Sequence, residues 1–134
     1  MALTTQLTLS LANETGSLAT LCRHLADAGV NLLALSADDR SGGAGSIRLL
    51  VASPDQAQKA LTKAGLAFES EQVLFVELKN RPGALAKATE RLARARIDIR
   101  YAYATSYRRA QRTAAVIAVS AGDLARASRL VAGH

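Results

Sequence analysis

The chain has 134 residues, of which 49% are hydrophobic and 21% charged, and its formal net charge is +6. This composition is typical of a soluble globular protein and excludes a disordered chain. The length suits one domain or two very small ones. Cys22 is the only cysteine, which excludes an internal disulfide and a cysteine zinc site and favours a reducing, cytoplasmic compartment.

The first half of the chain predicts the element order βαββαβ. Alternating leucines over residues 7–11 predict a strand with one buried face. A helix follows, because apolar residues recur at helical spacing at Leu18, Leu21, Cys22 and Leu25. The remaining expected elements are strands over 31–37 and 46–52 with a turn over 39–45 between them, a helix from Pro54 to Gly65, and a short strand over 66–70.

The second half of the chain predicts the same order without its last strand. The expected elements are a strand over 73–79, a helix after Pro82-Gly83, a hairpin of strands 97–105 and 112–120, and a helix over 122–132. The helix after Gly83 has an apolar stripe at Leu85, Ala88, Thr89 and Leu92. No sequence remains for a fourth strand, so either one sheet is a strand short or something else fills its edge.

The two halves are copies of one unit. Residues 7–36 align without a gap with residues 74–103, at a shift of 67 residues, and nine of these thirty positions are identical. We therefore predict two tandem units, residues 1–71 and 72–134. Each is expected to form an α+β, ferredoxin-like fold with an antiparallel sheet and both helices on one face.

Apolar side chains also occur on the second face of the expected strands, as in the segments LLALSA and AAVIAVS. This pattern and the open sheet edge predict a homodimer or a higher even oligomer. No window reaches about 18 uninterrupted apolar residues, and no basic segment precedes an apolar run at the start. We therefore expect neither a membrane span nor a signal peptide.

The segment Asn80–Ala86 links a strand to a helix and could hold a small anion. We expect Pro82 to pre-set the first helical turn, and Gly83 leaves room for a ligand to approach the free N–H groups of that turn. These groups and the helix dipole favour a carboxylate or phosphate. Asn80 is placed to cap the helix or to contact the ligand. The alternative is a plain strand-to-helix turn without a ligand.

The segment ELKNRPGALAKATERLARARIDIRYAYAT resembles the start of an ACT domain, and LSLANETGSLATLCRHLADAGVNLLALSA resembles it more weakly, with Thr15 in place of the usual proline. The resemblance implies a ferredoxin-like fold and regulatory binding of an amino acid. The site it implies lies between the strand-to-helix turn of one unit and the second strand of a neighbour. By position, the implied ligand-binding residues are Asn80, Arg81, Pro82, Gly83, Ala84, Leu85, Asp98 and Ile99, and in the first unit Asn13, Glu14, Thr15, Gly16, Ser17, Leu18, Asn31 and Leu32.

Different residues of this set are suited to different groups of an amino-acid ligand. Backbone N–H groups would bind the carboxylate, and the side-chain oxygen of Asn31 or Asp98 would accept a hydrogen bond from an ammonium group. For Asp98, a solvated strand end is an equally good interpretation. The sequence holds no catalytic domain, so we expect any regulation to act on a separate metabolic enzyme.

Two other classes of function compete with a regulatory module. The whole excess of positive charge lies in residues 68–134, which is typical of proteins that bind nucleic acids. However, the central strands GSIRLLVAS and RTAAVIAVS carry no aromatic side chain on which a base could stack, which argues against an RNA- or DNA-binding domain. No nucleophile with a base and no metal-ligand cluster is found, so we expect no enzyme, no metal and no cofactor.

Overall fold

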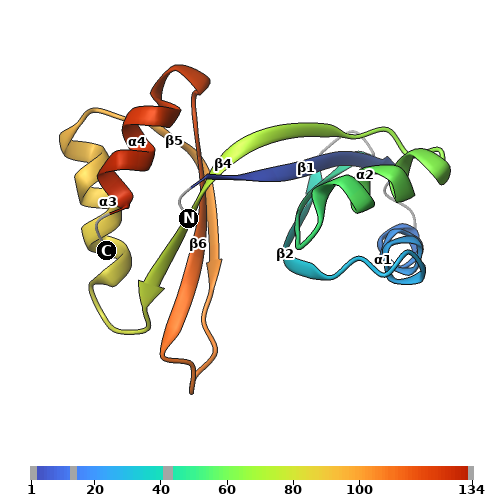
Figure 1. Ribbon diagram of the computed structural model, residues 1–134, viewed down its shortest axis with the longest axis horizontal. Coiled ribbons are helices and arrows are strands. Elements are labelled where there is room, and N and C mark those ends of the chain that lie inside the picture. Colours follow the sequence, from blue (N-terminus) through green and yellow to red (C-terminus); the bar gives the residue numbers. More distant parts are fainter. Residues whose placement is uncertain (1–2, 13–14, 41–43, 133–134) are drawn as a thin grey trace. The chain divides into compact units, whose positions relative to one another are not determined.

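The computed structural model describes residues 3–12, 15–40 and 44–132 (Figure 1). The elements follow in the order β1 (Leu3–Ala12), α1 (Ser17–Asp27), β2 (Leu32–Arg40), β3 (Ala44–Val51), α2 (Pro54–Lys63), β4 (Glu69–Lys79), α3 (Ala84–Arg94), β5 (Ile99–Thr105), β6 (Arg112–Val119), the 3-10 turn η1 (Ala121–Asp123) and α4 (Leu124–Val131). The turn predicted over 39–45 was too long, because β2 runs to Arg40 and β3 begins at Ala44. Residues 41–43 lie outside the described ranges.

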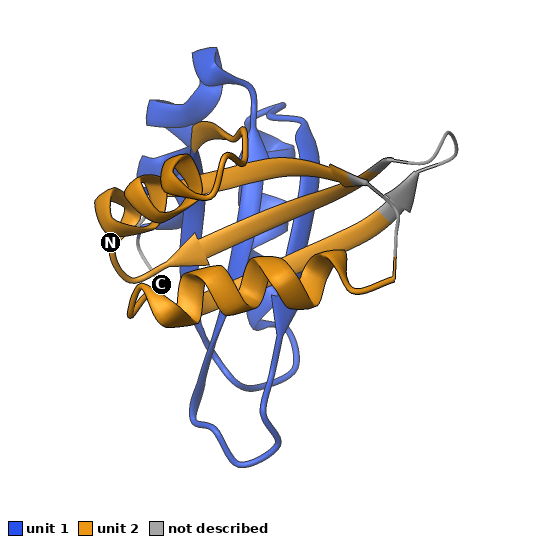
Figure 2. Ribbon diagram, turned by 90° about the vertical axis from the view of Figure 1, so that its right-hand side faces the viewer, with its two compact units in different colours: residues 1–4, 72–134 blue, residues 5–71 orange. Residues whose placement is uncertain are grey.

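The chain forms two compact units (Figure 2). Residues 5–71 make up one, called here the N-terminal unit; residues 1–4 together with 72–134 make up the other, the C-terminal unit. The predicted tandem division after residue 71 remains a proposal about domains. The compact units differ from it in one respect, because the start of β1 belongs with the second half of the chain.

The N-terminal unit has the strand order β2-β3-β1-β4, with β3 antiparallel to both β1 and β2. Its last strand is the beginning of β4, where Gln6 Nε2 donates a hydrogen bond of 3.3 Å to Glu71 Oε1. Helices α1 and α2 cover one face of this sheet, and leucines from strands and helices fill the space between them: Leu7, Leu9, Leu21, Leu25, Leu49 and Leu61. The order β2-β3-β1-β4 is that of a ferredoxin-like βαββαβ unit, as predicted.

The C-terminal unit repeats this order as β5-β6-β4-β1. No strand follows α4 among the described residues; instead, the start of β1 occupies the fourth position of the sheet, and Leu3 packs against the core under α3 and α4. The chain's own first strand therefore fills the edge that the sequence left open.

Helix periodicity correctly identifies the buried face of α3. Ala88 and Leu92 are fully buried in the cluster between α3, α4 and the sheet, together with Leu74 and Ile117 from the strands. Leu85 belongs to the same stripe but is 43% exposed, because it lies in the first turn of the helix.

Strand β4 is one continuous element of 11 residues, whereas the sequence predicted separate strands over 66–70 and 73–79. The polar run Ser70–Gln72 resembles a break in the apolar pattern. A strand can carry polar side chains toward solvent without ending, and this run contains no proline or glycine to stop it. No helix in the described ranges is long and apolar enough to cross a bilayer.

Candidate functional site

The turn between β4 and α3 has the features of a type II β-turn. The N–H of Ala84 donates to the carbonyl of Arg81 at 3.3 Å, and Gly83 adopts φ 90° and ψ −12°, which suits the third residue of such a turn. Pro82 takes the second position, where its fixed φ is favourable. The helix follows Pro82-Gly83, as predicted: α3 begins at Ala84 and Gly83 is its N-cap, so Pro82 belongs to the β-turn and not to the first helical turn.

The turn between β1 and α1 ends in the same conformation. Gly16 is the N-cap of α1 with φ 91° and ψ −6°. Thr15 precedes it, at the position that Pro82 has in the other copy. Asn13 and Glu14, which the resemblance also implicates, lie outside the described residues.

Both helices begin with an open N-terminus. In α1 and α3, no side-chain cap is found among the described residues, and no acidic residue lies in the first turn. A Cβ atom added to Gly16 or Gly83 would meet no heavy atom within 4 Å among the described residues. In α3, no carbonyl of the helix can accept a hydrogen bond from the N–H groups of Leu85 and Ala86. Ligand oxygens could reach these N–H groups, and the helix dipole would favour an anion there.

Asn80 neither caps α3 nor leaves its side chain free. Its Nδ2 donates to the carbonyl oxygens of Tyr107 at 3.1 Å and Ala110 at 2.8 Å, and its Oδ1 accepts from Ser106 Oγ at 2.7 Å. These three partners belong to the loop that joins β5 to β6. Asn80 therefore anchors that loop to the end of β4, and its backbone N–H adds a fourth bond, to the carbonyl of Gln111.

We expect Asn80→Ala to lower the free energy of unfolding by about 1 to 3 kcal/mol, because it removes these side-chain bonds at a half-buried position. Urea denaturation measures the loss, and hydrogen exchange of loop residues 106–111 should accelerate. Asn80→Asp keeps the acceptor for Ser106 but puts a carboxylate oxygen against the carbonyl oxygens of Tyr107 and Ala110, so it should also destabilise the loop. A loop that exchanges at the wild-type rate in Asn80→Ala would contradict this role.

Within one unit, the structure does not bring the turn and the start of the second strand together. In the C-terminal unit, β5 begins at Ile99 opposite Val119 and ends at Thr105 opposite Ala114. The turn after Lys79 lies at the latter end, since Lys79 pairs with Arg112. The seven residues of β5 therefore separate the exposed Asp98 from the turn by roughly 20 Å.

The N-terminal unit shows the same separation. Leu32, preceded by the exposed Asn31, pairs with Val51 at one end of β3, while Ala12 pairs with Ala44 at the other end. A site that combines a turn with a second-strand start therefore cannot form within one unit.

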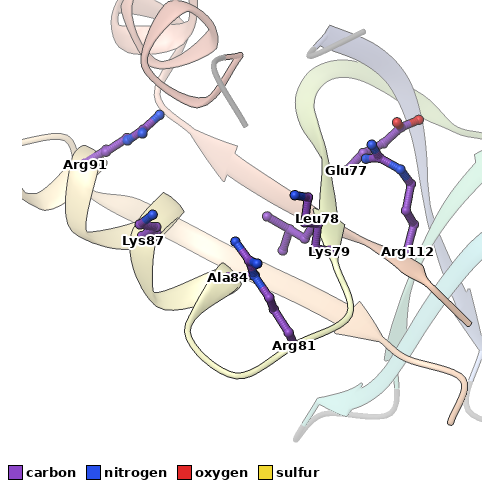
Figure 3. Close-up of a pocket in the computed structure, with 8 residues that line it drawn as sticks. All are labelled: Glu77, Leu78, Lys79, Arg81, Ala84, Lys87, Arg91 and Arg112. Atoms are coloured by element: carbon purple, nitrogen blue, oxygen red, sulfur yellow. The ribbon is translucent and has the colours of Figure 1, made fainter.

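A cavity of about 210 Å³ lies beside the turn that precedes α3. Five basic residues, one acidic residue and two apolar residues line it: Lys79, Arg81, Lys87, Arg91, Arg112, Glu77, Leu78 and Ala84. Figure 3 shows Glu77 and Arg112 together on one side of β4, and Arg81, Lys87 and Arg91 on the side of α3. The Arg91 guanidinium also donates to the carbonyl of Leu130 at the end of α4, at 3.4 Å.

Of the residues that line this cavity, sequence reasoning identified only Arg81 and Ala84 as candidates. Lys79, Lys87, Arg91 and Arg112 were not among the candidates. The available signal was the excess of positive charge in the second half of the chain, which a comparison of the two copies position by position would have localised. No group of three or more metal-ligating side chains occurs in the part of the chain that the structure describes.

Comparisons with known proteins agree with this architecture. A model of the ACT domain pair family matches residues 1–129. The crystal structure of protein BT0572 from Bacteroides thetaiotaomicron is similar, with a TM-score of 0.85 and 29% identity over 96% of this chain and 86% of that chain. The regulatory subunit of aspartate kinase from Thermus thermophilus has the same fold, with a TM-score of 0.67 and 17% identity over 98% of this chain and 95% of that chain. No curated protein matches the chain at a significant level. The match to the family model spans nearly the whole chain, both copies of the repeat included, and the chain therefore belongs to the ACT domain pair family.

Proposed function

We propose that this protein is a regulatory module that senses an amino acid or a similar small carboxylate at its strand-to-helix turns. The observation that carries the proposal is the pair of open helix N-termini. Each follows a glycine with positive φ and has no acidic residue in its first turn; among the residues that the structure describes, neither has a side-chain cap, and nothing lies within 4 Å of where a Cβ of either glycine would be. Because both copies keep the same open turn, a ligand-binding role is favoured over a purely structural one.

We further propose that a second copy of the chain completes each site. One unit holds its turn and its second-strand start about 20 Å apart, so the ammonium acceptor must come from elsewhere. The second strands β2 and β5 lie at the edges of their sheets and expose Leu33, Leu35 and Ile99. A homodimer that covers these edges would bring Asp98 or Asn31 of one copy toward a turn of the other.

The output of such a module would be the regulation of a separate enzyme in the cytoplasm rather than catalysis. The aspartate kinase regulatory subunit, which has the same fold, is a precedent for a regulatory role of this architecture. The single cysteine, Cys22, is free, in keeping with a reducing compartment.

A thermal-shift screen with the twenty amino acids and simple carboxylates tests the proposal. A ligand present at about 100 times its dissociation constant should add roughly 2.7 kcal/mol to the free energy of unfolding. The protein should be stabilised by at least one carboxylate ligand. If none of these compounds raises the melting temperature, the proposed sensing function is wrong.

Paired variants locate the site. Leu85→Glu places a carboxylate in the first turn of α3, at a position that is 43% exposed, where it favours the helix but repels the carboxylate of a ligand. Leu18→Glu does the same in α1, at a position that is 39% exposed. Leu85→Gln and Leu18→Gln are the uncharged controls. Calorimetry should show binding lost in one or both Glu variants and kept in the Gln variants; equal binding in all four would place the site elsewhere.

A further inference from the structure

The two copies of the repeat differ in charge at one place in the fold. The cavity beside α3 is lined by five cations and a single carboxylate, that of Glu77. At the shift of 67 residues, the counterparts of Lys79, Arg81, Lys87 and Arg91 are Ala12, Glu14, Thr20 and His24. Strand register places Ala44 at the position of Arg112, since Ala12 pairs with Ala44 as Lys79 pairs with Arg112. The first copy therefore has none of the five Lys or Arg residues.

The cations of this cavity outnumber its one carboxylate, that of Glu77, which Figure 3 shows beside Arg112. Among the residues that the structure describes, none of the five forms an ion pair with a carboxylate, whereas Arg23, Arg48 and Arg126 each do. The apolar side chain of Leu78, 3% exposed, and that of Ala84 line the same cavity and limit its solvation. Arg81, Lys87 and Arg91 share the α3 side of β4 (Figure 3), and this group of cations beside apolar side chains attracts anions strongly.

Two pairs within the cavity bring like charges together. Lys79 and Arg112 are direct partners across the β4–β6 ladder, an arrangement that is destabilising for two cations. Lys87 and Arg91 are separated by four residues on α3, where like charges also repel. Leu78 is buried against α3, so alternation along β4 directs Lys79 and its partner Arg112 to the other face of the sheet, where Figure 3 shows Arg112. An anion bound on the α3 side would therefore relieve the repulsion between Lys87 and Arg91 only. This gives an observation independent of the open helix N-terminus.

We infer that the cavity beside α3 binds a small molecule with at least two negative charges, a dicarboxylate or a phosphate ester, and that the N-terminal unit has no counterpart of this site. For a dicarboxylate, one carboxylate would lie at the N–H groups of the first turn of α3, and Arg81, Lys87 and Arg91 would bind the other; a phosphate would share its oxygens between these two sets of donors. The inference rests on the proposed function in that it uses the same turn, and it adds the ligand class and the division of labour between the two copies.

Calorimetry on the full chain at pH 8 and low salt, with succinate, inorganic phosphate and alanine as probes, tests the inference. Succinate or phosphate should bind at one site per chain, at least about tenfold more tightly than alanine, because it engages additional charge-assisted hydrogen bonds. Succinate binding alone would indicate a dicarboxylate ligand, and phosphate binding alone a phosphate ester. The affinity should fall as salt rises.

Two matched double variants separate a built site from diffuse attraction. Arg81→Gln with Lys87→Gln removes two charges from the cavity and should weaken dianion binding at least about tenfold. Arg94→Gln with Arg129→Gln removes two exposed charges of α3 and α4 that do not line the cavity, and should change the affinity by less than about twofold.

Each outcome decides between the proposals. Equal losses in both double variants, or tight binding of a 20-base-pair DNA that weakens equally in both, would show diffuse charge and overturn the inference. Stabilisation by a neutral amino acid without dianion binding would also overturn it and leave the proposed function intact. Dianion binding that depends on Arg81 and Lys87, with no response to any amino acid, would support the inference and contradict amino-acid sensing. If no compound binds, both proposals fail.

Discussion

Leu92→Ala is expected to lower the free energy of unfolding by about 2 to 5 kcal/mol. Leu92 has no solvent exposure and lies in the cluster where α3 and α4 meet the sheet, so the truncated side chain leaves a cavity as well as losing apolar burial. Small proteins have a total stability of only about 5 to 15 kcal/mol, so this single change would remove a large part of it. Urea or thermal denaturation measures the difference.

The repeat supplies both a second test and a control. Leu25 is the counterpart of Leu92 in α1 and is 1% exposed, so Leu25→Ala should cost a similar amount in the N-terminal unit. Leu85→Ala acts on the same helix as Leu92 but at a position that is 43% exposed, and should cost less than about 1 kcal/mol. If Leu92→Ala cost no more than Leu85→Ala, the described core would be wrong.

The helices could be predicted from sequence because their signals are local. The spacing of Leu21 with Leu25, and of Ala88 with Leu92, identifies the face that each helix buries. The same spacing included Leu18 and Leu85, which are 39% and 43% exposed. Periodicity gives the direction in which a side chain points, but the depth at which it is buried depends on what packs over it.

The completion of the C-terminal sheet by the start of β1 could not be predicted in this way. The identities between the two copies begin at Leu7 and Leu74, so the alignment left out the strand residues before them. Leu3 and Thr4 have no local feature that assigns them to a sheet formed by the other half of the chain. Their place in that sheet depends on pairing with a strand far along the chain, and no local pattern in the sequence indicates this pairing.

The candidate site likewise has one part that local sequence identifies and another that only long-range contacts bring together. The requirement for glycine at residues 16 and 83 is a local property of the backbone, and the sequence pattern identified both turns. The cations of the cavity come from β4, the turn, α3 and β6, and they converge only in the folded chain. Asn80 was predicted to act at the helix it precedes, but its partners belong to the loop between β5 and β6, some 26 to 30 residues further along the chain.

Gly83→Val tests the backbone conformation on which the site depends, and it should lower the free energy of unfolding by about 1 to 3 kcal/mol. At φ 90° a residue with a Cβ is crowded against its own backbone, and a β-branched side chain suffers most. Nothing lies within 4 Å of the added Cβ among the described residues, so the cost should come from backbone strain rather than from collision with a neighbour. Gly83→Asn should cost less, because asparagine tolerates left-handed conformations better than valine does.

Gly122→Ala is the matched control: its φ is not positive and its Cβ would also meet nothing within 4 Å, so it should be neutral or stabilising by about 0.4 to 1 kcal/mol. Thermal denaturation of the three variants gives the order. If valine at residue 83 were tolerated as well as alanine at residue 122, the turn would not have the positive φ that exposes the N–H groups of α3, and the anion site would lose its structural basis.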